Sequence, residues 1–457
     1  MKGLLITGDR SGSGKTSITL ALSALLARTM AVQTFKVGMD YIDPSYLTGV
    51  TGRPCRNLDS FVLDSGQIRD VFTYGCAGAD FVMVEGVRGL FEGAEALSDR
   101  GTTADIAKQL DLNVILVVNA ASITRSAAAI VKGFAAFDTG VKIRGVILNN
   151  IGSDTHRDKA VRAIEHYCGI PVIGAIPRSD EMKLTMRHLG LVPYLEGKGS
   201  ETFLERIGSV VDIIGNHVDI DALLGLAGDI ALPAGIPPIY ETAPADLRIG
   251  IAVDEAFNFY YADLFDMLAS LGAEPVPFSP IHDRLPDAEG YILGGGYPEL
   301  FTEQLEANDS MREAILGASR AGVPIYAECG GLLYLTDRIV LKKGYQERDR
   351  DEEYEMCGVF SGETRMPSRR VIGYVEGFSD DTSPLGPARF AGHEFHHTDV
   401  RLAPDTHYAY RLTRGKGIRD TLDGAVIGRT QGSYTHLHPV ASRGMLARFT
   451  EICRTRD

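Results

Sequence analysis

The chain has 457 residues and a formal net charge of −14, and 44% of its residues are hydrophobic while 23% are charged. This length exceeds what one hydrophobic core usually serves, and the composition is that of an ordinary folded protein, so we expect two domains and little disorder. The negative charge disfavours non-specific binding to nucleic acid or to an anionic membrane, and no apolar run approaches the length of a membrane span.

The six cysteines are scattered along the chain without a CxxC pair or a regular spacing. This arrangement argues against a disulfide scaffold and against a structural zinc site. Together with the short apolar start "MKGLLITG", it predicts a protein that stays in the reducing cytoplasm.

Apolar, β-rich runs alternate with helical patterns through the first half of the chain. The runs are "GLLIT", "FVMVE", "VILVVNA", "GVILNN" and "PVIGAIP". Continuous apolar strands separated by helices predict a parallel sheet that is covered by helices on both faces. Ligands of such a sheet bind at the carboxyl ends of its strands.

A glycine-rich loop, "TGDRSGSGKTS", follows the first predicted strand and leads into the first predicted helix. Its backbone N–H groups can contact phosphate oxygens, Lys15 can neutralise the outer phosphates, and Thr16 can offer its hydroxyl to Mg²⁺. The spacing departs from GxxxxGK[ST], because Gly8 stands one position early and Asp9 takes its expected place. The ATP-binding residues predicted from this loop are Gly12, Ser13, Gly14, Lys15, Thr16 and Ser17.

Carboxylates follow two of the predicted strands. Glu85 ends "FVMVE", where it can hold the Mg²⁺ that bridges nucleotide phosphates, and Glu92 lies a little farther into the loop. Asp40 and Asp43 follow the strand in "FKVGMDYIDPSY", where metal, nucleotide and substrate contacts are all open. We predict Thr16, Glu85 and Asp40 as metal ligands, and Asp43 and Glu92 as substrate-binding residues, although Glu92 could equally be a solvated loop residue.

These stretches also carry a family resemblance. The long phosphate-binding loop resembles that of dethiobiotin-synthetase-like ATPases. The segments "SGSGKT", "FKVGMDYIDPSY", "EGVRGLFEG" and "SITRSAAAIVKGFAAFD" resemble, in this order, the synthetase half of cobyrinate a,c-diamide synthases. The segment "DYIDPSYLTGVTGRPCRNLDSFVLD" is most similar to the methanogen members that act on nickel-sirohydrochlorin. Cobyrinate enzymes commonly carry Asp at the position of Glu92. The resemblance implies an enzyme that activates tetrapyrrole carboxylates with ATP.

The best linker candidate is the segment 229–247, "DIALPAGIPPIYETAPADL", which is rich in proline and alanine. It lies between a helical stretch and a new predicted strand, "RIGIAV". We therefore predict an ATP-dependent domain over residues 1–245 and a second domain over residues 246–457.

In the second half, "VPIYAECGGLLYL" reads as a strand, a sharp turn and the start of a helix, which places Cys329 on a nucleophile elbow. A buried cysteine is more often a small hydrophobe, so a base is also needed, and "GSYTHLHP" supplies His436 and His438. The start of the helix would favour the thiolate. Gly295 and Gly296 in "YILGGGYPEL" could stabilise an oxyanion, or could simply form a tight turn.

The segments "GGGYPEL", "YAECGGLLYL", "GHEFHH" and "SYTHLHP" resemble the cobalamin-biosynthesis branch of class I glutamine amidotransferase domains. The resemblance implies that Cys329 is the nucleophile and His436 the base. Class I enzymes often carry a carboxylate two residues after this histidine, whereas this chain has His438, so the prediction is a Cys-His pair with the third group open. Glu394 could orient a histidine, contact glutamine or be structural.

The predicted architecture is α/β, with a P-loop, dethiobiotin-synthetase-like parallel sheet followed by a class I glutamine amidotransferase-like domain. The predicted function is a ligase that uses glutamine, ATP and Mg²⁺ to amidate the a and c acetates of nickel-sirohydrochlorin, with cobyrinate as a further candidate substrate. The alternative within this class is cobyrinate alone. A partitioning-type ATPase switch is the alternative from another class, but it would not explain Cys329 and His436. The partners expected are small molecules, and the oligomeric state stays open.

Overall fold

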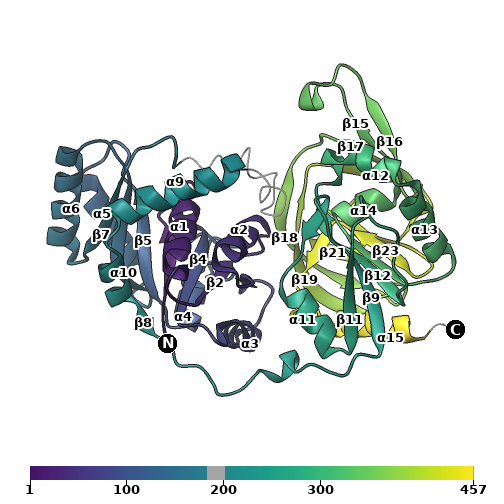
Figure 1. The fold of residues 1–457 in the computed structure, drawn as a ribbon, viewed down its shortest axis with the longest axis horizontal. Helices are drawn as coiled ribbons and strands as arrows, with labels where there is room; N and C mark the ends of the chain where they lie inside the picture. The colour runs from purple at the N-terminus through teal and green to yellow at the C-terminus, as the bar shows by residue number, and fades with distance from the viewer. Residues whose placement is uncertain (183–200, 456–457) are drawn as a thin grey trace. The chain divides into compact units, whose positions relative to one another are not determined.

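The computed structural model describes residues 1–182 and 201–455. The chain divides into two compact units, Met1–Pro237 and Pro238–Asp457, and the division falls inside the segment 229–247 (Figure 1). Across the described ranges, no helix combines the length and the apolar character that crossing a membrane requires.

The first unit is built on a parallel sheet, as the alternation of apolar runs predicts. In its described part the strands run in the order β3-β2-β4-β1-β5-β6-β7, and β8 pairs antiparallel with β1. The strands are β1 (Lys2–Gly8), β2 (Val32–Val37), β3 (Arg56–Leu58), β4 (Phe81–Gly89), β5 (Asn113–Asn119), β6 (Lys142–Ile151), β7 (Val172–Pro177) and β8 (Gly228–Asp229). The central strands are buried along most of their length, which explains why they read as continuous apolar runs rather than as alternating ones.

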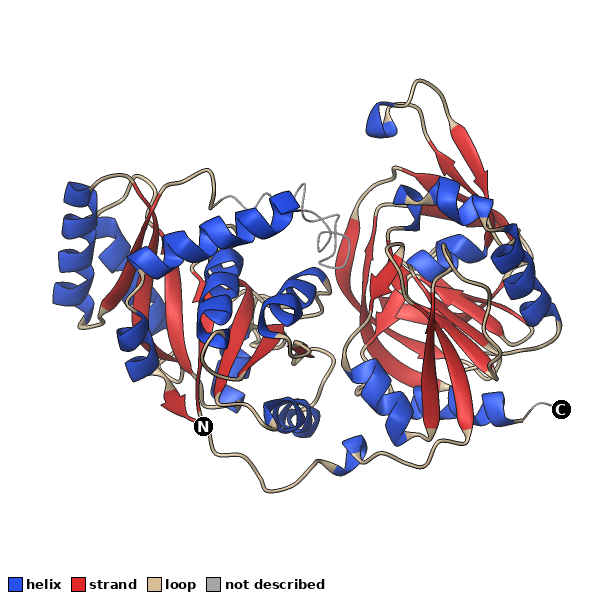
Figure 2. Cartoon of the chain, viewed as in Figure 1, coloured by secondary structure: helices blue, strands red, loops and turns tan. Residues whose placement is uncertain are grey.

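Helices connect the strands and cover the sheet (Figure 2). They are α1 (Lys15–Ala27), α2 (Ile42–Thr51), α3 (Ser65–Cys76), α4 (Thr103–Gln109), α5 (Arg125–Phe137), α6 (Asp154–Cys168), α9 (Glu201–His217) and α10 (Ile220–Leu226). Residues of α1, α2, α9 and α10 share one apolar core with β1, while α5 packs on α6. This arrangement leaves the carboxyl ends of the strands and the loops that follow them to carry a site.

The second unit is built on a large mixed sheet with two smaller sheets beside it. In the described residues the large sheet has the order β11-β9-β12-β14-β23-β22-β21-β18-β19-β24, and the others are β10-β13 and β16-β15-β17-β20. The strands are β9 (Leu247–Ala252), β10 (Phe257–Phe259), β11 (Ala273–Phe278), β12 (Gly290–Leu293), β13 (Gly295–Gly296), β14 (Ile325–Glu328), β15 (Thr336–Leu341), β16 (Glu352–Glu355), β17 (Phe360–Met366), β18 (Val371–Ser379), β19 (Ala388–His396), β20 (Asp399–Leu402), β21 (His407–Arg414), β22 (Leu422–Ile427), β23 (Thr430–Ser433) and β24 (Thr435–Leu437).

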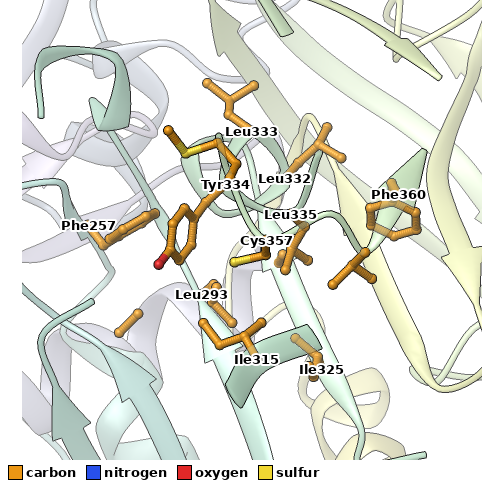
Figure 3. Packing of buried hydrophobic residues seen from close by; sticks show 14 of the residues in the cluster. Phe257, Leu293, Ile315, Ile325, Leu332, Leu333, Tyr334, Leu335, Cys357 and Phe360 are labelled. Atoms are coloured by element: carbon orange, nitrogen blue, oxygen red, sulfur yellow. The ribbon is translucent and has the colours of Figure 1, made fainter. Parts of the chain in front are cut away.

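The helices of this unit are α11 (Asp263–Ser270), α12 (Thr302–Ala307), α13 (Asp309–Arg320), α14 (Gly330–Leu335) and α15 (Arg443–Arg454), with short 3₁₀ turns η1 (Pro238–Tyr240), η2 (Pro298–Leu300) and η3 (Tyr345–Glu347). The apolar side chains of α14 lie within the core, where Tyr334 packs against Phe257 and Leu335 lies near Cys357 (Figure 3). Because α14 is held on so many sides, the residue that precedes it is held in a fixed position.

Candidate active sites

The phosphate-binding loop lies between β1 and α1, as its sequence predicts. Gly12 and Gly14 adopt φ of 77° and 94°, which a side chain would strain. A Cβ on Gly14 would also lie 2.2 Å from Nδ2 of Asn149, which donates a hydrogen bond to the carbonyl of Ser13. The unusual position of Gly8 has a steric reason, since a Cβ there would lie 2.1 Å from Oγ of Ser13. The loop is therefore shaped to present backbone to a ligand.

Glu85, inside β4, and Asp43, in the first turn of α2, meet at the first turn of α1. The Thr16 hydroxyl donates a hydrogen bond of 2.6 Å to Oε1 of Glu85 and lies 3.4 Å from Oδ2 of Asp43. Lys36, on β2, is 1% exposed and its Nζ lies 2.5 Å from Asp43 and 2.7 Å from Glu85. This buried lysine was not predicted, because β2, "VQTFKV", mixes polar and apolar residues and its sequence does not show that every residue is buried.

Burial and neighbouring charges compete in setting the pKa values of this cluster. Burial alone would lower the pKa of Lys36, but Asp43 and Glu85 hold that pKa well above its ordinary value. Burial and the neighbouring Lys36 lower the pKa of Lys15. Burial would raise the pKa of Asp43, but Lys36 holds it below the ordinary value, whereas burial raises the pKa of Glu85. Lys36 is therefore held in its charged form, paired with two carboxylates, beside the phosphate-binding loop.

The oxygen atoms of this cluster fit a hard divalent cation. Oδ1 of Asp43 and Oε2 of Glu85 are buried and have no hydrogen-bond partner, and the Thr16 hydroxyl lies beside them. Carboxylate and hydroxyl oxygens suit Mg²⁺, which completes its shell with water and phosphate oxygens. Asp40 has a different position, because its Oδ1 accepts the N–H groups of Ile42 and of Asp43 at the start of α2.

The environment of Glu92 differs from that of these buried groups. It is exposed, and its carboxylate folds back over Gly89 at the end of β4, where a Cβ would lie 2.1 Å from Oε2 of Glu92. Its assignment to substrate binding stays a prediction.

In the second unit, Cys329 stands at a sharp turn between β14 and α14. Its φ of 44° and ψ of −101° are unusual for a residue with a side chain, and strained backbone of this kind is typical of functional turns. Its N–H donates to the Ser433 carbonyl, and the Gly331 N–H donates to the Gly294 carbonyl. The structure thus has the predicted strand, sharp turn and helix around Cys329, whose role as nucleophile stays a prediction.

The thiol itself differs from the expectation of a favoured thiolate. Cys329 is only 5% exposed, and burial, followed by the negative charge of Glu299, raises its pKa. The first turn of a six-residue helix does not overcome these two effects. A thiol in this environment needs a base that removes its proton as it reacts.

His436, on β24, lies beside Gly295 of β13. A Cβ on Gly295 would lie 2.6 Å from Cε1 of His436, and a Cβ on Gly330 would lie 3.3 Å from the carbonyl carbon of Gly295. His436 is 1% exposed and stacks on His393 at 4.8 Å between ring centroids. Gly295 thus lies in contact with both the histidine and the turn that carries the cysteine.

The group that contacts His436 is Glu328, the residue before the cysteine. Nδ1 of His436 lies 3.3 Å from Oε2 of Glu328. The other carboxylate oxygen accepts the Leu437 N–H at 3.0 Å and the Tyr326 hydroxyl at 2.6 Å. Glu328 could not be assigned from the sequence, because strand neighbours point to opposite faces and only the fold shows which histidine lies next to Glu328.

The two other candidates for a third group have different contacts. Nδ1 of His438 lies 3.3 Å from the Val440 N–H, and its ring packs on Tyr261 at 4.8 Å. The carboxylate of Glu394 accepts the N–H groups of Lys416 and Gly417. These contacts favour structural roles for both residues.

The glycine pair of β13 lies against the elbow. A Cβ on Gly330 would lie 3.0 Å from the Gly296 nitrogen, and a Cβ on Gly296 would lie 2.0 Å from the Ala256 carbonyl oxygen. Gly296 also has a φ of 154°. A side chain there would therefore clash with Ala256 and would strain the backbone. The backbone of β13 can therefore approach a ligand at Cys329 closely.

Comparisons with known proteins agree with both units. Residues 4–192 match the CobQ/CobB/MinD/ParA nucleotide binding domain, and residues 248–443 match the CobB/CobQ-like glutamine amidotransferase domain. A cobyrinate a,c-diamide synthase of Methanosarcina acetivorans is 50% identical over 98% of this chain and 94% of its own length. Proteins of the same name from Methanothermobacter thermautotrophicus and Listeria monocytogenes are 41% and 42% identical, and each alignment covers at least 96% of both chains.

A nucleotide-binding P-loop unit joined to a glutamine amidotransferase unit defines a glutamine-dependent amidoligase. The chain belongs to the cobyrinate a,c-diamide synthase family. The predicted fold class and the predicted family are both confirmed.

Proposed function

We propose that this enzyme amidates the a and c acetate side chains of a tetrapyrrole, with glutamine as nitrogen donor and ATP as the activating co-substrate. The observation that carries the proposal is the elbow of Cys329, with His436 and Glu328 in hydrogen-bond contact beside it. A nucleotide switch would have no use for that arrangement. Cobyrinate is the substrate that the relatives' names indicate.

Nitrogen release begins with the attack of Cys329 Sγ on the side-chain amide of glutamine. His436 accepts the thiol proton and then donates it to the departing ammonia, and water hydrolyses the thioester to glutamate. The Gly296 N–H, at the elbow, stabilises the oxyanion. Glu328 fixes the imidazole through Nδ1, so that Nε2 is the nitrogen that exchanges the proton.

Carboxylate activation takes place at the phosphate-binding loop. A tetrapyrrole acetate attacks the γ-phosphorus of ATP to give an acyl phosphate and ADP, and ammonia then displaces phosphate. Lys15 and Lys36 stabilise the charge of the transferring phosphoryl group, because both are held at the end of the sheet beside the loop. Thr16, Asp43 and Glu85 would hold Mg²⁺, which neutralises phosphate charge when it is bound; Asp40 remains an alternative ligand.

Nickel-sirohydrochlorin is the substrate that we propose in addition to cobyrinate. Its support is the sequence from Asp40 to Asp64 and the presence of Glu92 after β4. Glu92 is exposed, so it is accessible to a large ligand, and Asp43 would lie on the reacting side of the loop.

The test is mass spectrometry of full-length enzyme incubated with ATP, glutamine and either tetrapyrrole. We expect two amides on cobyrinate and two on nickel-sirohydrochlorin. Glu92→Asp should change the ratio of the two products and leave glutamine hydrolysis unchanged. No amidation of the nickel compound would refute the additional substrate, and no amidation of either compound would refute the proposed function.

A further inference from the structure

Glu299 is a buried carboxylate that the reaction described above does not use. It lies in η2, directly after the glycine pair of β13, and it is 6% exposed. Its Oε2 is fully buried and has no hydrogen-bond partner. Within residues 1–182 and 201–455 no Lys, Arg or His forms an ion pair with it, and burial raises its pKa to about 7. Such a carboxylate lacks the partner that a buried charge normally has, which is a cation.

The segment that carries Glu299 borders the elbow. A Cβ on Gly330 would lie 3.1 Å from Cδ of Pro298, the residue before Glu299. Burial raises the pKa of the Cys329 thiol most, and the charge of Glu299 is the second cause, ahead of the adjacent Glu328. The segment that carries Glu299 therefore borders the turn at which glutamine would react.

The ligand expected at Cys329 carries the cation that Glu299 lacks. Free glutamine has a neutral amide at one end, where the thiol attacks, and an α-ammonium and an α-carboxylate at the other. Binding of the α-ammonium group would neutralise the buried charge of Glu299. This contact would also distinguish free glutamine from amides that lack an α-ammonium group. We propose that Glu299 receives the α-ammonium group of glutamine and so selects the free amino acid as nitrogen donor.

This inference rests on the proposed glutaminase reaction of Cys329. The test compares glutamine with 4-carbamoylbutanoate, which lacks only the α-amino group, and with 4-aminobutanamide, which lacks only the α-carboxylate. The full-length enzyme and its Glu299→Gln variant are assayed for ammonia release from each compound. Glu303→Gln is the matched control, because Glu303 is an exposed carboxylate on the neighbouring α12.

In the unaltered enzyme, loss of the α-amino group should lower kcat/KM by about 10²-fold. Glu299→Gln should lower kcat/KM for glutamine by a similar factor, mainly through KM, and should treat glutamine and 4-carbamoylbutanoate within about threefold of each other. Glu303→Gln should behave as the unaltered enzyme. Amidation supported by added ammonia should persist in both variants, which shows that they fold.

Three results would overturn the inference. A Glu299→Gln variant that still discriminates fully against 4-carbamoylbutanoate has lost no ammonium contact. A variant that loses kcat equally with all three compounds shows an effect on the thiol instead. A variant that loses discrimination only against 4-aminobutanamide shows that Glu299 binds the α-carboxylate as a neutral acid. Absence of glutamine hydrolysis in the unaltered enzyme would instead refute the proposed function.

Discussion

At the scale of single residues, the environment of each ionisable group decides what it can do. Cys329 is buried and its pKa is raised, so its reactivity depends on proton removal rather than on a standing thiolate. His436 is the base that we propose, and its ring is held by Glu328 and stacked on His393. A fixed ring is useful because a general base works only within hydrogen-bond reach of the proton.

The contact between Glu328 and His436 makes a testable prediction. Glu328→Gln keeps the size of the side chain but removes the charge that stabilises the imidazolium formed during the reaction. We expect kcat for glutamine hydrolysis to fall by about 10²-fold, with little change in KM. Steady-state kinetics with glutamine would measure this, and amidation with added ammonia should be unaffected.

Tyr326→Phe is the control for that variant, since it removes a hydrogen bond to the same carboxylate but leaves the charge in place. Its loss of kcat should be under tenfold, roughly the value of one neutral donor. Equal losses in the two variants would contradict a role for the charge of Glu328 and would indicate that Glu328 only supports the strand.

The raised pKa of Glu299 predicts how the stability of the protein depends on pH. Burial raises the pKa of Glu299 from 4.5 to about 7. Between these values the folded protein binds more protons than the unfolded chain, so stability falls as pH rises through this range. At about pH 8, Glu299→Gln should be more stable than the unaltered enzyme by about 3 kcal/mol, since each pKa unit is worth about 1.4 kcal/mol.

The measurement is thermal unfolding of the full chain without glutamine at pH 8 and below pH 4.5. The greater stability of Glu299→Gln should disappear at the lower pH, because Glu299 is then protonated in both the folded and the unfolded chain. An advantage of the same size at both pH values would contradict the buried charge. Glu303→Gln should show no difference at either pH, because that carboxylate is exposed.

At the scale of elements, β13 sets the spacing between the histidine and the elbow. It consists of only Gly295 and Gly296, and it pairs with β10. Gly295→Ala would place a Cβ 2.6 Å from the His436 ring, which must then move away. We expect glutamine hydrolysis to fall by about 10²-fold while ammonia-supported amidation continues, as paired assays on one preparation would show.

The matched substitution is Gly317→Ala on α13, where a Cβ has nothing within 4 Å. It should leave both activities unchanged and stabilise the protein by about 0.5 to 1 kcal/mol, since glycine is unfavourable inside a helix. Full glutaminase activity in Gly295→Ala would contradict the proposed spacing.

The features that the sequence could predict are those built from neighbouring residues. The phosphate-binding loop and the elbow each lie between a strand and a helix that adjoin it in the chain, so their motifs contain the geometry. Glu328, Glu299 and Lys36 could not be assigned in the same way. Their partners, or the lack of one, depend on strands and loops that are far apart in sequence and meet only in the fold.

At the scale of the whole molecule, the two reactions belong to two units that each have a core of their own. The phosphate-binding loop, Lys36 and the carboxylates all lie in the first unit, while Cys329, His436 and Glu328 lie in the second. Substitutions in one site should therefore affect one chemistry and leave the other measurable. This separation is what makes ammonia-supported amidation a control throughout.

The most direct test of the account follows nitrogen from glutamine to product. Glutamine labelled with ¹⁵N in its side-chain amide is supplied with ATP and cobyrinate, and the product is weighed by mass spectrometry. With the proposed mechanism, we expect both new amides to carry ¹⁵N, and we expect Cys329→Ala to incorporate no label from glutamine but still to form both amides from unlabelled ammonia. Label incorporation that persists in Cys329→Ala, or amides that lack the label in the unaltered enzyme, would contradict it.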